Sequence, residues 1–187
     1  LLILLLNSNA ELFQRLNAWS RIPCTGFWAH LTIMGDALIA SVIVLPFIRK
    51  RPNLIWNVVL AAVIGALLIQ ALKPLIDLSR PAAVLDRNSF ETIGRILTRR
   101  SFPSGHSATA LMLTGVFALN SRSRAGRVII LVAGWIVALS RVMVGAHWPL
   151  DVLAGGITGL FSAWSAYQVS RWWRWGLRRI PMIIWGS

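Results

Sequence analysis

The chain contains little cysteine, little acidic charge and little charge of any sign. Cys24 is its single cysteine, which excludes an intrachain disulfide and a thiolate metal cluster. Only six aspartate and glutamate residues face 19 lysines and arginines, and charged residues make up 13% of the 187 positions, about half the share of a soluble domain. The sequence also lacks a glycine-rich nucleotide loop and the histidine and cysteine spacing of a zinc site. These absences disfavour a soluble nucleotide-binding or zinc-binding domain.

Long apolar runs take the place of the missing charge, since 56% of the residues are hydrophobic. Five segments are long enough to cross a bilayer or nearly so. They cover residues 25–48, 53–78, 105–119, 128–146 and 149–170. Together with a weaker N-terminal segment, they predict an all-α integral membrane bundle of about six transmembrane helices, forming one domain over residues 1–187.

The N-terminal segment, residues 1 to about 19, is too polar to cross a bilayer whole. We expect either the tail of a span or a helix lying in the membrane interface. Residues 1–6 lack the basic leader and the cleavage site of a signal peptide. Because the chain does not begin with methionine, we expect further residues upstream of Leu1.

The net charge of +13 comes mainly from arginines in short connectors between the apolar runs. This distribution favours anionic lipid as the partner and disfavours nucleic acid. The basic groups after the first, third and fifth runs lie at 49–51, 122–127 and 171–179, which alternating spans place on one side. Short basic loops stay in the cytoplasm, so the long connector 79–102 is expected on the outer face. The oligomeric state is left open.

Three polar clusters interrupt the apolar pattern at span ends. Ionisable groups at such positions are costly and are usually functional. The expected topology places all three clusters at the same membrane face. They are Lys73 with Arg80-Pro81, the run Pro103-Ser104-Gly105-His106, and Ser140-Arg141 with His147 and Asp151.

Several of these residues suit the binding of a phosphate group. Lys73, Arg80 and Arg141 can neutralise its charge, and the arginines offer paired donors. Ser104 is a good helix N-cap, and Gly105 lets the backbone approach closely. The amides that open the following helix would then face an anion.

Two histidines and a carboxylate suit the chemistry of phosphoryl transfer. Pro149 favours the first turn of a helix, which places His147 just before that helix and Asp151 within its first turn. Asp151 can then accept a hydrogen bond from one imidazole nitrogen of His147 and leave the other free as a nucleophile. His106 remains as the acid that protonates the departing oxygen.

Each residue taken alone also has a structural explanation. Lys73 and Arg80 could be anchors whose charges reach the headgroups, and Ser104 an ordinary cap. Asp151 could be a carboxylate placed at a helix start by the helix dipole, and His147 an interfacial residue. Their joint arrival at one membrane face favours the functional interpretation.

The three clusters resemble the signature of the type 2 phosphatidic acid phosphatase (PAP2) superfamily. The resemblance covers residues 73–151 with the spacing of that family and no substitution. It implies a six-helix membrane fold and a metal-independent phosphatase without a cofactor. It further implies that His147 attacks phosphorus, that Asp151 orients the His147 imidazole and that His106 protonates the leaving group. The phosphate-binding residues would be Lys73, Arg80, Ser104, Gly105 and Arg141.

We therefore expect a bacterial inner-membrane phosphatase whose site faces the exterior or periplasm. Undecaprenyl diphosphate is the favoured substrate; phosphatidylglycerophosphate, phosphatidate and lipid A are alternatives, as is transfer of the phosphoryl group to another lipid. Vanadium haloperoxidases share this pocket but are soluble, which the apolar runs oppose. A non-catalytic lipid-binding protein is the alternative of another class, and intact His106, His147 and Asp151 disfavour it.

Three further charged residues have open roles. Asp36 lies inside the first apolar run and needs a partner there. We expect a structural partner, with contact to the site as the alternative. Arg99 and Arg100 precede the Pro103 run; we expect solvated loop charges, with contact to a diphosphate or headgroup as the alternative.

Overall fold

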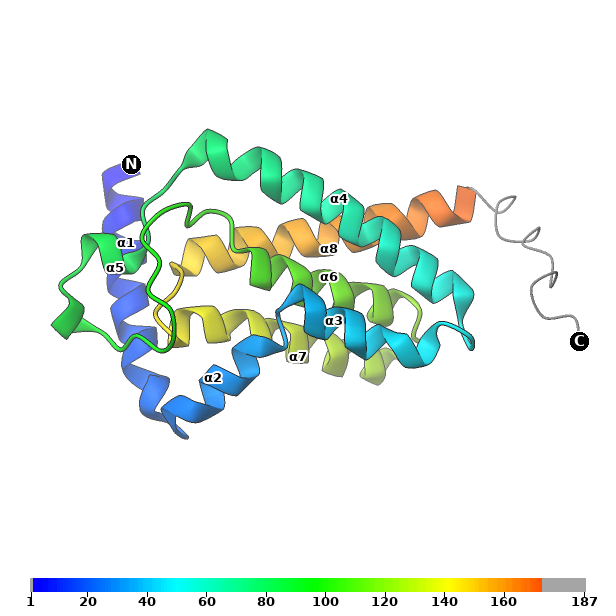
Figure 1. The fold of residues 1–187 in the computed structure, drawn as a ribbon, viewed down its shortest axis with the longest axis horizontal. Coiled ribbons are helices and arrows are strands. Elements are labelled where there is room, and N and C mark those ends of the chain that lie inside the picture. Colours follow the sequence, from blue (N-terminus) through cyan, green and yellow to red (C-terminus); the bar gives the residue numbers. More distant parts are fainter. Residues whose placement is uncertain (1, 173–187) are drawn as a thin grey trace, which may run out of the picture.

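The computed structural model describes residues 2–172, and this part of the chain is helical without a strand. The helices of the bundle run along the long axis of the molecule (Figure 1). They are α4 (Pro52–Ile76), α6 (Gly105–Leu119), α7 (Arg124–Met143) and α8 (Pro149–Trp172). α6 and α8 form the centre, because each of them contacts the other three helices. The prediction of an all-α bundle is confirmed.

α6 and α8 pack unusually closely, because glycines of α8 face the contact. A side chain on Gly155 would begin 2.3 Å from the carbonyl oxygen of Ser104, and one on Gly159 would begin 2.2 Å from that of Ala108. A larger residue at either position would push the helices apart. The contact therefore fixes the start of α6 against the first turns of α8.

The first apolar run is divided. Within the run 25–48, α2 (Thr25–Ile33) and α3 (Ala37–Val44) are separate helices, and a single span formed by this bent pair stays a prediction. The short helix η2 (Leu45–Phe47) extends α3. The angle between α2 and the segment formed by α3 and η2 is 65°. Asp36 is the N-cap of α3, because its carboxylate accepts a hydrogen bond from the Leu38 backbone amide at 2.8 Å. A polar residue with a local backbone bond ends one helix and begins another.

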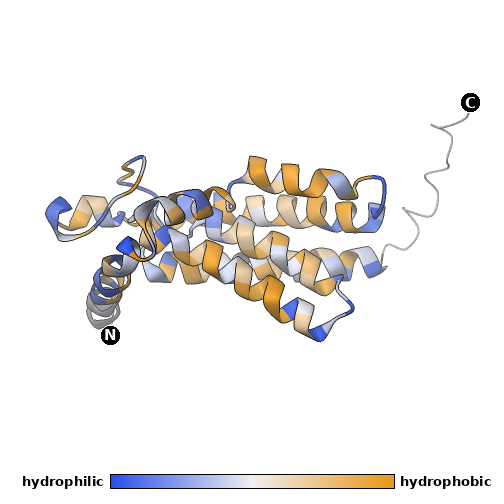
Figure 2. Cartoon of the chain, turned by 90° about the horizontal axis from the view of Figure 1, so that it is seen from below, coloured by the Kyte–Doolittle hydropathy of each residue, from blue (hydrophilic) through white to orange (hydrophobic). Residues whose placement is uncertain are grey.

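The number of spans stays a prediction. Among the described residues, the stretch Pro52–Val84 and α7 are long and apolar enough to cross a membrane, and the bent α2–α3 pair would make a third. α6 is apolar but shorter, with 15 residues. Figure 2 shows apolar residues along the length of the bundle and hydrophilic ones gathered toward its ends.

The N-terminal helix α1 (Leu2–Asn17) crosses one end of the bundle instead of running along it (Figure 1). Its Phe13 is fully buried and meets the rings of Phe90 and Trp148 edge-on. The side-chain amide of its Asn17 donates hydrogen bonds to the backbone carbonyl oxygens of Glu91, Val142 and Met143. Through these residues α1 packs against this end of the bundle, and its place relative to the membrane stays a prediction. The short helix η1 (Ala18–Arg21) leads from α1 toward α2.

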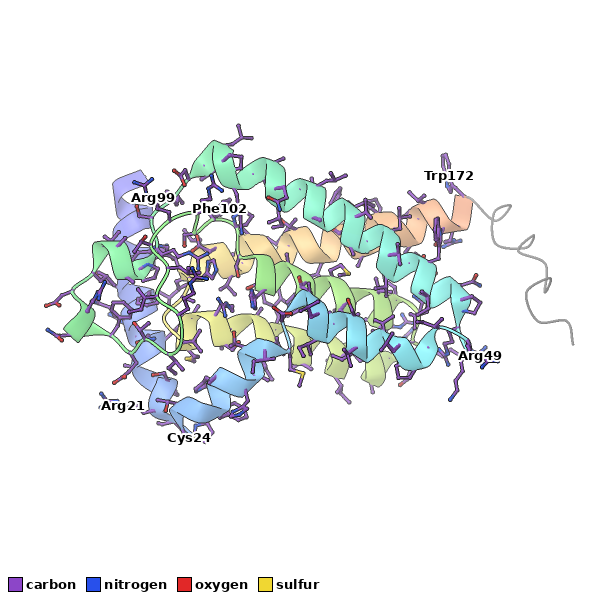
Figure 3. All side chains as sticks on the ribbon, in the orientation of Figure 1. Arg21, Cys24, Arg49, Arg99, Phe102 and Trp172 are labelled. Atoms are coloured by element: carbon purple, nitrogen blue, oxygen red, sulfur yellow. The ribbon has the colours of Figure 1, made fainter. Side chains whose placement is uncertain are left out.

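The connectors divide between the two ends of the bundle. Figure 3 places Arg99 and Phe102 at the end that α1 crosses, and Arg49 and Trp172 at the opposite end. The long connector at the first end contains α5 (Pro81–Val84) and η3 (Arg87–Ser89). The described basic connectors of 49–51 and 122–127 thus lie away from the long one, as expected. The third basic group extends beyond Arg171 to residues 174–179, outside the described part.

Candidate active site

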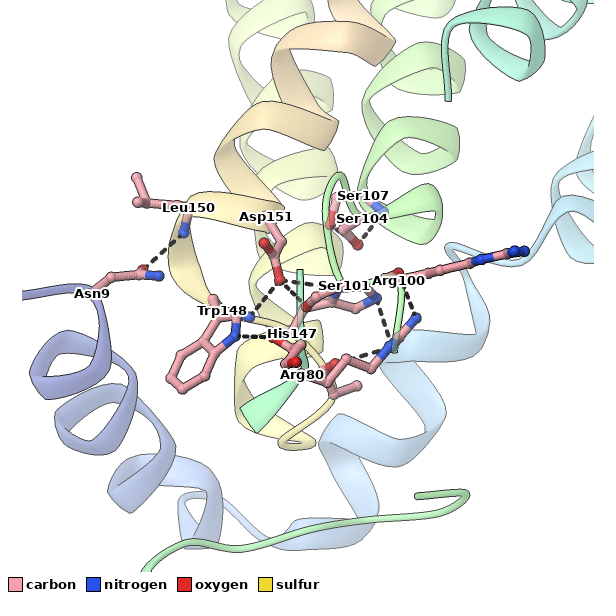
Figure 4. A network of polar contacts seen from close by, with 12 residues as sticks. Asn9, Arg80, Arg100, Ser101, Ser104, Ser107, His147, Trp148, Leu150 and Asp151 are labelled. Carbon is pink, nitrogen blue, oxygen red and sulfur yellow. Dashed lines mark hydrogen bonds and ion pairs between the residues drawn. The ribbon is translucent and has the colours of Figure 1, made fainter. Parts of the chain in front are cut away.

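The three polar clusters meet at the end of the bundle that α1 crosses. Lys73 lies in the last turn of α4, Ser104 and His106 at the start of α6, and Arg141 in the last turn of α7. The turn between α7 and α8 carries His147. Figure 4 shows the centre of the cluster, where Arg80, His147 and Asp151 lie together. Segments far apart in the sequence therefore contribute to one site.

The Asp151 carboxylate is the anchor of this centre, and 1% of its side chain is exposed. Its Oδ2 accepts from the Trp148 amide at 2.9 Å and from the Ser101 hydroxyl. The same oxygen lies 3.4 Å from Nδ1 of His147. Because Asp151 is in the first turn of α8, four residues after His147, the helix start sets the position of this carboxylate.

His147 is held from its other side by Arg80. Nη1 of Arg80 lies 3.1 Å from Nε2 of the imidazole and donates to the Ala146 carbonyl at 3.0 Å. A guanidinium can only donate hydrogen bonds, so Nε2 must accept and carries the lone pair. The ring proton then sits on Nδ1, facing Asp151. The pair of contacts selects the tautomer in which Nε2 is a potential nucleophile.

His147 lies in the turn between α7 and α8 and is almost completely buried. Burial lowers the pKa of His147 to about 4, against its hydrogen bond to Asp151, which raises it. The positive charges of Arg80 and Arg141 lower this pKa further. The imidazole is therefore neutral at pH 7.

The connector holds Arg80 in a fixed place. The Arg80 amide donates to the Thr98 carbonyl at 2.9 Å, and the Ser101 amide donates to the Leu78 carbonyl at 2.8 Å. These bonds pair two segments of the connector. The Arg80 guanidinium then donates to the carbonyl oxygens of Arg99 at 2.9 Å and Arg100 at 3.4 Å. In Figure 4 the Arg100 side chain extends away from the cluster, so this residue contributes its backbone to the centre.

The start of α6 is tied to α8. Ser104 is fully buried, its Oγ accepts from the Ser107 amide and hydroxyl, and its own amide donates to the Asp151 carbonyl at 3.0 Å. The Lys73 ammonium lies 4.0 Å from the point where a side chain on Gly105 would begin. The cation and the helix start thus lie side by side, as an anion site requires.

Arg141 has a partner that the motifs did not indicate. Its Nη1 donates to the Thr32 hydroxyl of α2 at 2.7 Å. Its Nε is buried and has no hydrogen-bond partner within the part of the chain that the structure describes. A buried donor of this kind is usually satisfied by a ligand or by water. Arg141 thus offers an N–H for an oxyanion.

His106 stands at the edge of the cluster and opens onto a cavity. Its Nε2 lies 4.0 Å from Oδ2 of Asp36, and the two side chains are 38% and 42% exposed. The charges of Arg141, Asp36, Arg80 and Lys73 all act on this imidazole. The structure thus brings His106 into the electrostatic range of the predicted phosphate-binding cations, although no hydrogen bond joins it to the His147 centre within the described residues.

The cavity beside His106 is apolar and has a volume of about 630 Å³. It extends between α3 and α4 over a floor formed by α6. Asp36, Gly105 and His106 line its polar end, and the remaining walls are mainly alanine, valine and isoleucine from these helices, such as Ala40, Val44, Ile55 and Ala62. α3 and α4 are neighbours in sequence, yet they leave this space between them.

Two contacts could not be found from the sequence. Ser101 holds Asp151 from 50 positions away, and Thr32 holds Arg141 from 109 positions away. Neither residue has a distinctive pattern around it. Asp36 did carry a signal, since it is a carboxylate in an apolar run, but its contact with His106 was the less favoured alternative.

Comparison with protein families gives one match over most of the chain. The family model of the PAP2 superfamily matches residues 54–175, which include all three motif clusters. Several named proteins are similar in sequence, among them the following two. An undecaprenyl-diphosphatase of Sulfolobus acidocaldarius is 28% identical over 171 residues, which are 86% of this chain and 78% of that protein. A lipid A 1-phosphatase of Rhizobium etli is 39% identical over 113 residues, and the chain spans 47% of its length.

Two solved structures have the same fold. Aquifex aeolicus LpxE superposes with a TM-score of 0.77 at 23% identity, covering 84% of this chain and 93% of that one. A PAP2-type phosphatidylglycerolphosphate phosphatase of Bacillus subtilis gives 0.69 at 20% identity, covering 88% and 87%. At these identities the likeness concerns the fold alone.

Proposed function

The chain belongs to the PAP2 superfamily, and from this we propose that it is an integral membrane phosphatase that removes phosphate from a lipid phosphate or diphosphate through a phosphohistidine at His147. The observation that carries the proposal is the arrangement around this residue. Its Nε2 bears a lone pair, its Nδ1 proton faces Asp151, and the positive charges of Arg80 and Arg141 act on it.

In the first step, Nε2 of His147 attacks phosphorus and the bond from phosphorus to the leaving oxygen breaks. His106 gives its proton to that oxygen, so the lipid alcohol or lipid monophosphate departs with its leaving oxygen protonated. Asp151 stabilises the positive charge that develops on His147, as a buried carboxylate does for a nucleophilic histidine system. The product of this step is a phosphorus–nitrogen bond on His147.

In the second step, water attacks phosphorus and His106 takes a proton from it. The phosphorus–nitrogen bond breaks, inorganic phosphate leaves, and Nε2 regains its lone pair. The protonated His106 is then ready for the next turnover. In both steps charge spreads over the equatorial phosphoryl oxygens, which must be neutralised.

Cationic groups support this neutralisation. Arg80 already contacts Nε2, where the phosphoryl group would bind, and the unpartnered Nε of Arg141 offers a donor. Lys73 and the first amides of α6, capped by Ser104 and including Gly105, would complete the oxyanion site. Because these groups supply the positive charge, we propose that turnover needs no divalent metal.

A lipid substrate is supported by the apolar cavity. Its polar end is lined by His106, and its walls of alanine, valine and isoleucine suit a hydrocarbon chain. Undecaprenyl diphosphate is the favoured substrate, supported by the named activity of the Sulfolobus relative; lipid A, phosphatidylglycerophosphate and phosphatidate are the competitors. The basic connectors at the opposite end support a site on the outer face of a bacterial inner membrane.

The test is a phosphate-release screen of the purified protein in detergent with a chelator of divalent metals present. Substrates would be undecaprenyl diphosphate, undecaprenyl phosphate, phosphatidylglycerophosphate, phosphatidate and lipid A, with a second lipid as acceptor in parallel reactions to detect transfer. The His147→Ala variant is the control for contaminating phosphatases. Release from at least one lipid by the wild type alone supports the proposal. A strict requirement for added metal, or equal release by the variant, contradicts it.

A further inference from the structure

Asp36 lies at the break between α2 and α3, and this break packs against the start of α6. A side chain on Gly35 would begin 3.0 Å from the carbonyl oxygen of His106 and 3.2 Å from its Cβ. Only a residue without a side chain allows this approach without displacement. Thr32, in the last turn of α2 just before the break, accepts a hydrogen bond from Arg141. The bend therefore brings two polar side chains to the edge of the candidate site.

The two carboxylate oxygens of Asp36 face different groups. Oδ1 accepts from the Leu38 amide at 2.8 Å and caps α3. Oδ2 lies 4.0 Å from Nε2 of His106, a distance for a charge pair and longer than a hydrogen bond. A cap alone needs only one oxygen, so the second is free to act on the imidazole.

The charges around His106 give this second oxygen a role. Three of the described groups that act on the imidazole are cations, namely Lys73, Arg80 and Arg141, and the fourth is the Asp36 carboxylate. An acid must carry a proton before it can donate one, and the three cations oppose a positive charge on the ring. Asp36 and His106 also open onto an apolar cavity, where charges interact more strongly than in water.

We propose that Asp36 is a positioning residue for proton transfer, which holds the His106 imidazolium in place while the substrate bond breaks. The inference deepens the proposed function and rests on it. The proton moves from His106 to the leaving oxygen, and in the second step a proton moves from water to His106. Asp36 acts through the imidazole without touching the substrate.

Substrates with different leaving groups distinguish a role of Asp36 in proton transfer from a purely structural role. An alkoxide is a poor leaving group and needs the proton of His106, whereas 4-nitrophenolate leaves without one. Asp36→Asn keeps the size of the side chain and an oxygen that can cap α3, but removes the charge. In detergent, we expect this variant to lower kcat for octyl phosphate by roughly tenfold to hundredfold, a part of the roughly 10²–10⁴-fold contribution of general acid catalysis. We expect it to change kcat for 4-nitrophenyl phosphate by less than about threefold.

Asp86→Asn is the matched control. Asp86 caps η3 by accepting from the Asn88 amide at 3.1 Å, the same local contact that Asp36 makes with Leu38. We expect this variant to match the wild type on both esters. An equal loss on both esters for Asp36→Asn, or no loss on either, overturns the positioning role. A wild type that cleaves neither ester and none of the lipids of the screen overturns the proposed function, and this inference with it.

Discussion

Arg80 and His147, 67 positions apart, are joined by a contact of 3.1 Å between Nη1 and Nε2. The contact sets which imidazole nitrogen carries the proton, because a guanidinium accepts no hydrogen bond. It also marks where a phosphoryl group would bind, since an arginine that faces the nucleophile also faces the oxygens of the group under attack. Arg80 thus selects the tautomer and, in the proposed function, would also neutralise phosphoryl charge.

Arg80→Lys tests whether the planar fork is needed. The lysine keeps the positive charge but cannot contact His147 and the carbonyls of Ala146, Arg99 and Arg100 together. We expect kcat for lipid phosphate to fall by roughly 10²-fold, the usual cost of losing one oriented donor at a transition state. Steady-state phosphate release checks this. The exposed Arg87→Lys serves as the control, and a rate for Arg80→Lys close to that of the control would contradict the assigned role.

Ser101→Ala tests the anchor of the nucleophile. The substitution removes a buried hydroxyl that donates to the Asp151 carboxylate, while the Trp148 amide remains as a donor. We expect a loss of about 1–3 kcal/mol in the free energy of unfolding and a fall in kcat with little change in KM. Chemical unfolding in detergent and steady-state kinetics measure the two effects. Ser89→Ala, which removes an exposed hydroxyl, should change neither the free energy of unfolding nor kcat. If Ser101→Ala also changes neither, the role of Ser101 in holding Asp151 is contradicted.

Ala62→Phe tests whether the cavity takes the hydrocarbon chain. Ala62 lines the cavity, while its neighbour Val63 on α4 is exposed and does not line it. We expect Ala62→Phe to raise KM for undecaprenyl diphosphate by about tenfold or more and to leave 4-nitrophenyl phosphate unaffected. Val63→Phe adds a ring outside the cavity and should leave both unchanged. Equal effects of Ala62→Phe on both substrates would show that the hydrocarbon chain of the lipid binds outside this cavity.

The protonation of His147 can be measured directly. Because burial lowers its pKa to about 4, the unfolded chain, with an ordinary histidine pKa near 6.5, binds more protons between these values. The contribution of His147 to stability is therefore complete above about pH 6.5 and is lost as the pH falls toward 4. NMR of histidine-labelled protein, with the three histidines assigned by single substitutions, should show His147 neutral at pH 6. A titration midpoint at or above 6.5 would contradict the buried neutral imidazole.

The sequence predicted those parts of the site that depend on local pattern. Ser104 and Pro149 mark helix starts, and α6 and α8 begin at Gly105 and Pro149. Hydropathy alone placed the three clusters at one face, because helices of a bundle must return to the same side. The roles of the individual residues stay predictions until they are measured.

Other parts of the structure depend on contacts that no local pattern records. Hydropathy averages over a window, so the bend at Asp36 was invisible within the apolar run 25–48. The bond from Ser101 to Asp151 and that from Thr32 to Arg141 join distant segments whose serine and threonine are common residues. The placement of α1 across the bundle end depends on the packing of Phe13 against Trp148.

The most direct test of the account is to trap the phosphorylated protein. Wild type and His147→Ala would be mixed with lipid diphosphate labelled in its terminal phosphate, quenched within one turnover and analysed by peptide mass and label. We predict an alkali-stable, acid-labile phosphoryl group on the peptide that contains His147, and neither label nor phosphate release in the variant. Phosphate release by the wild type with no label at any time, or labelled protein in the variant, would contradict covalent catalysis through this imidazole.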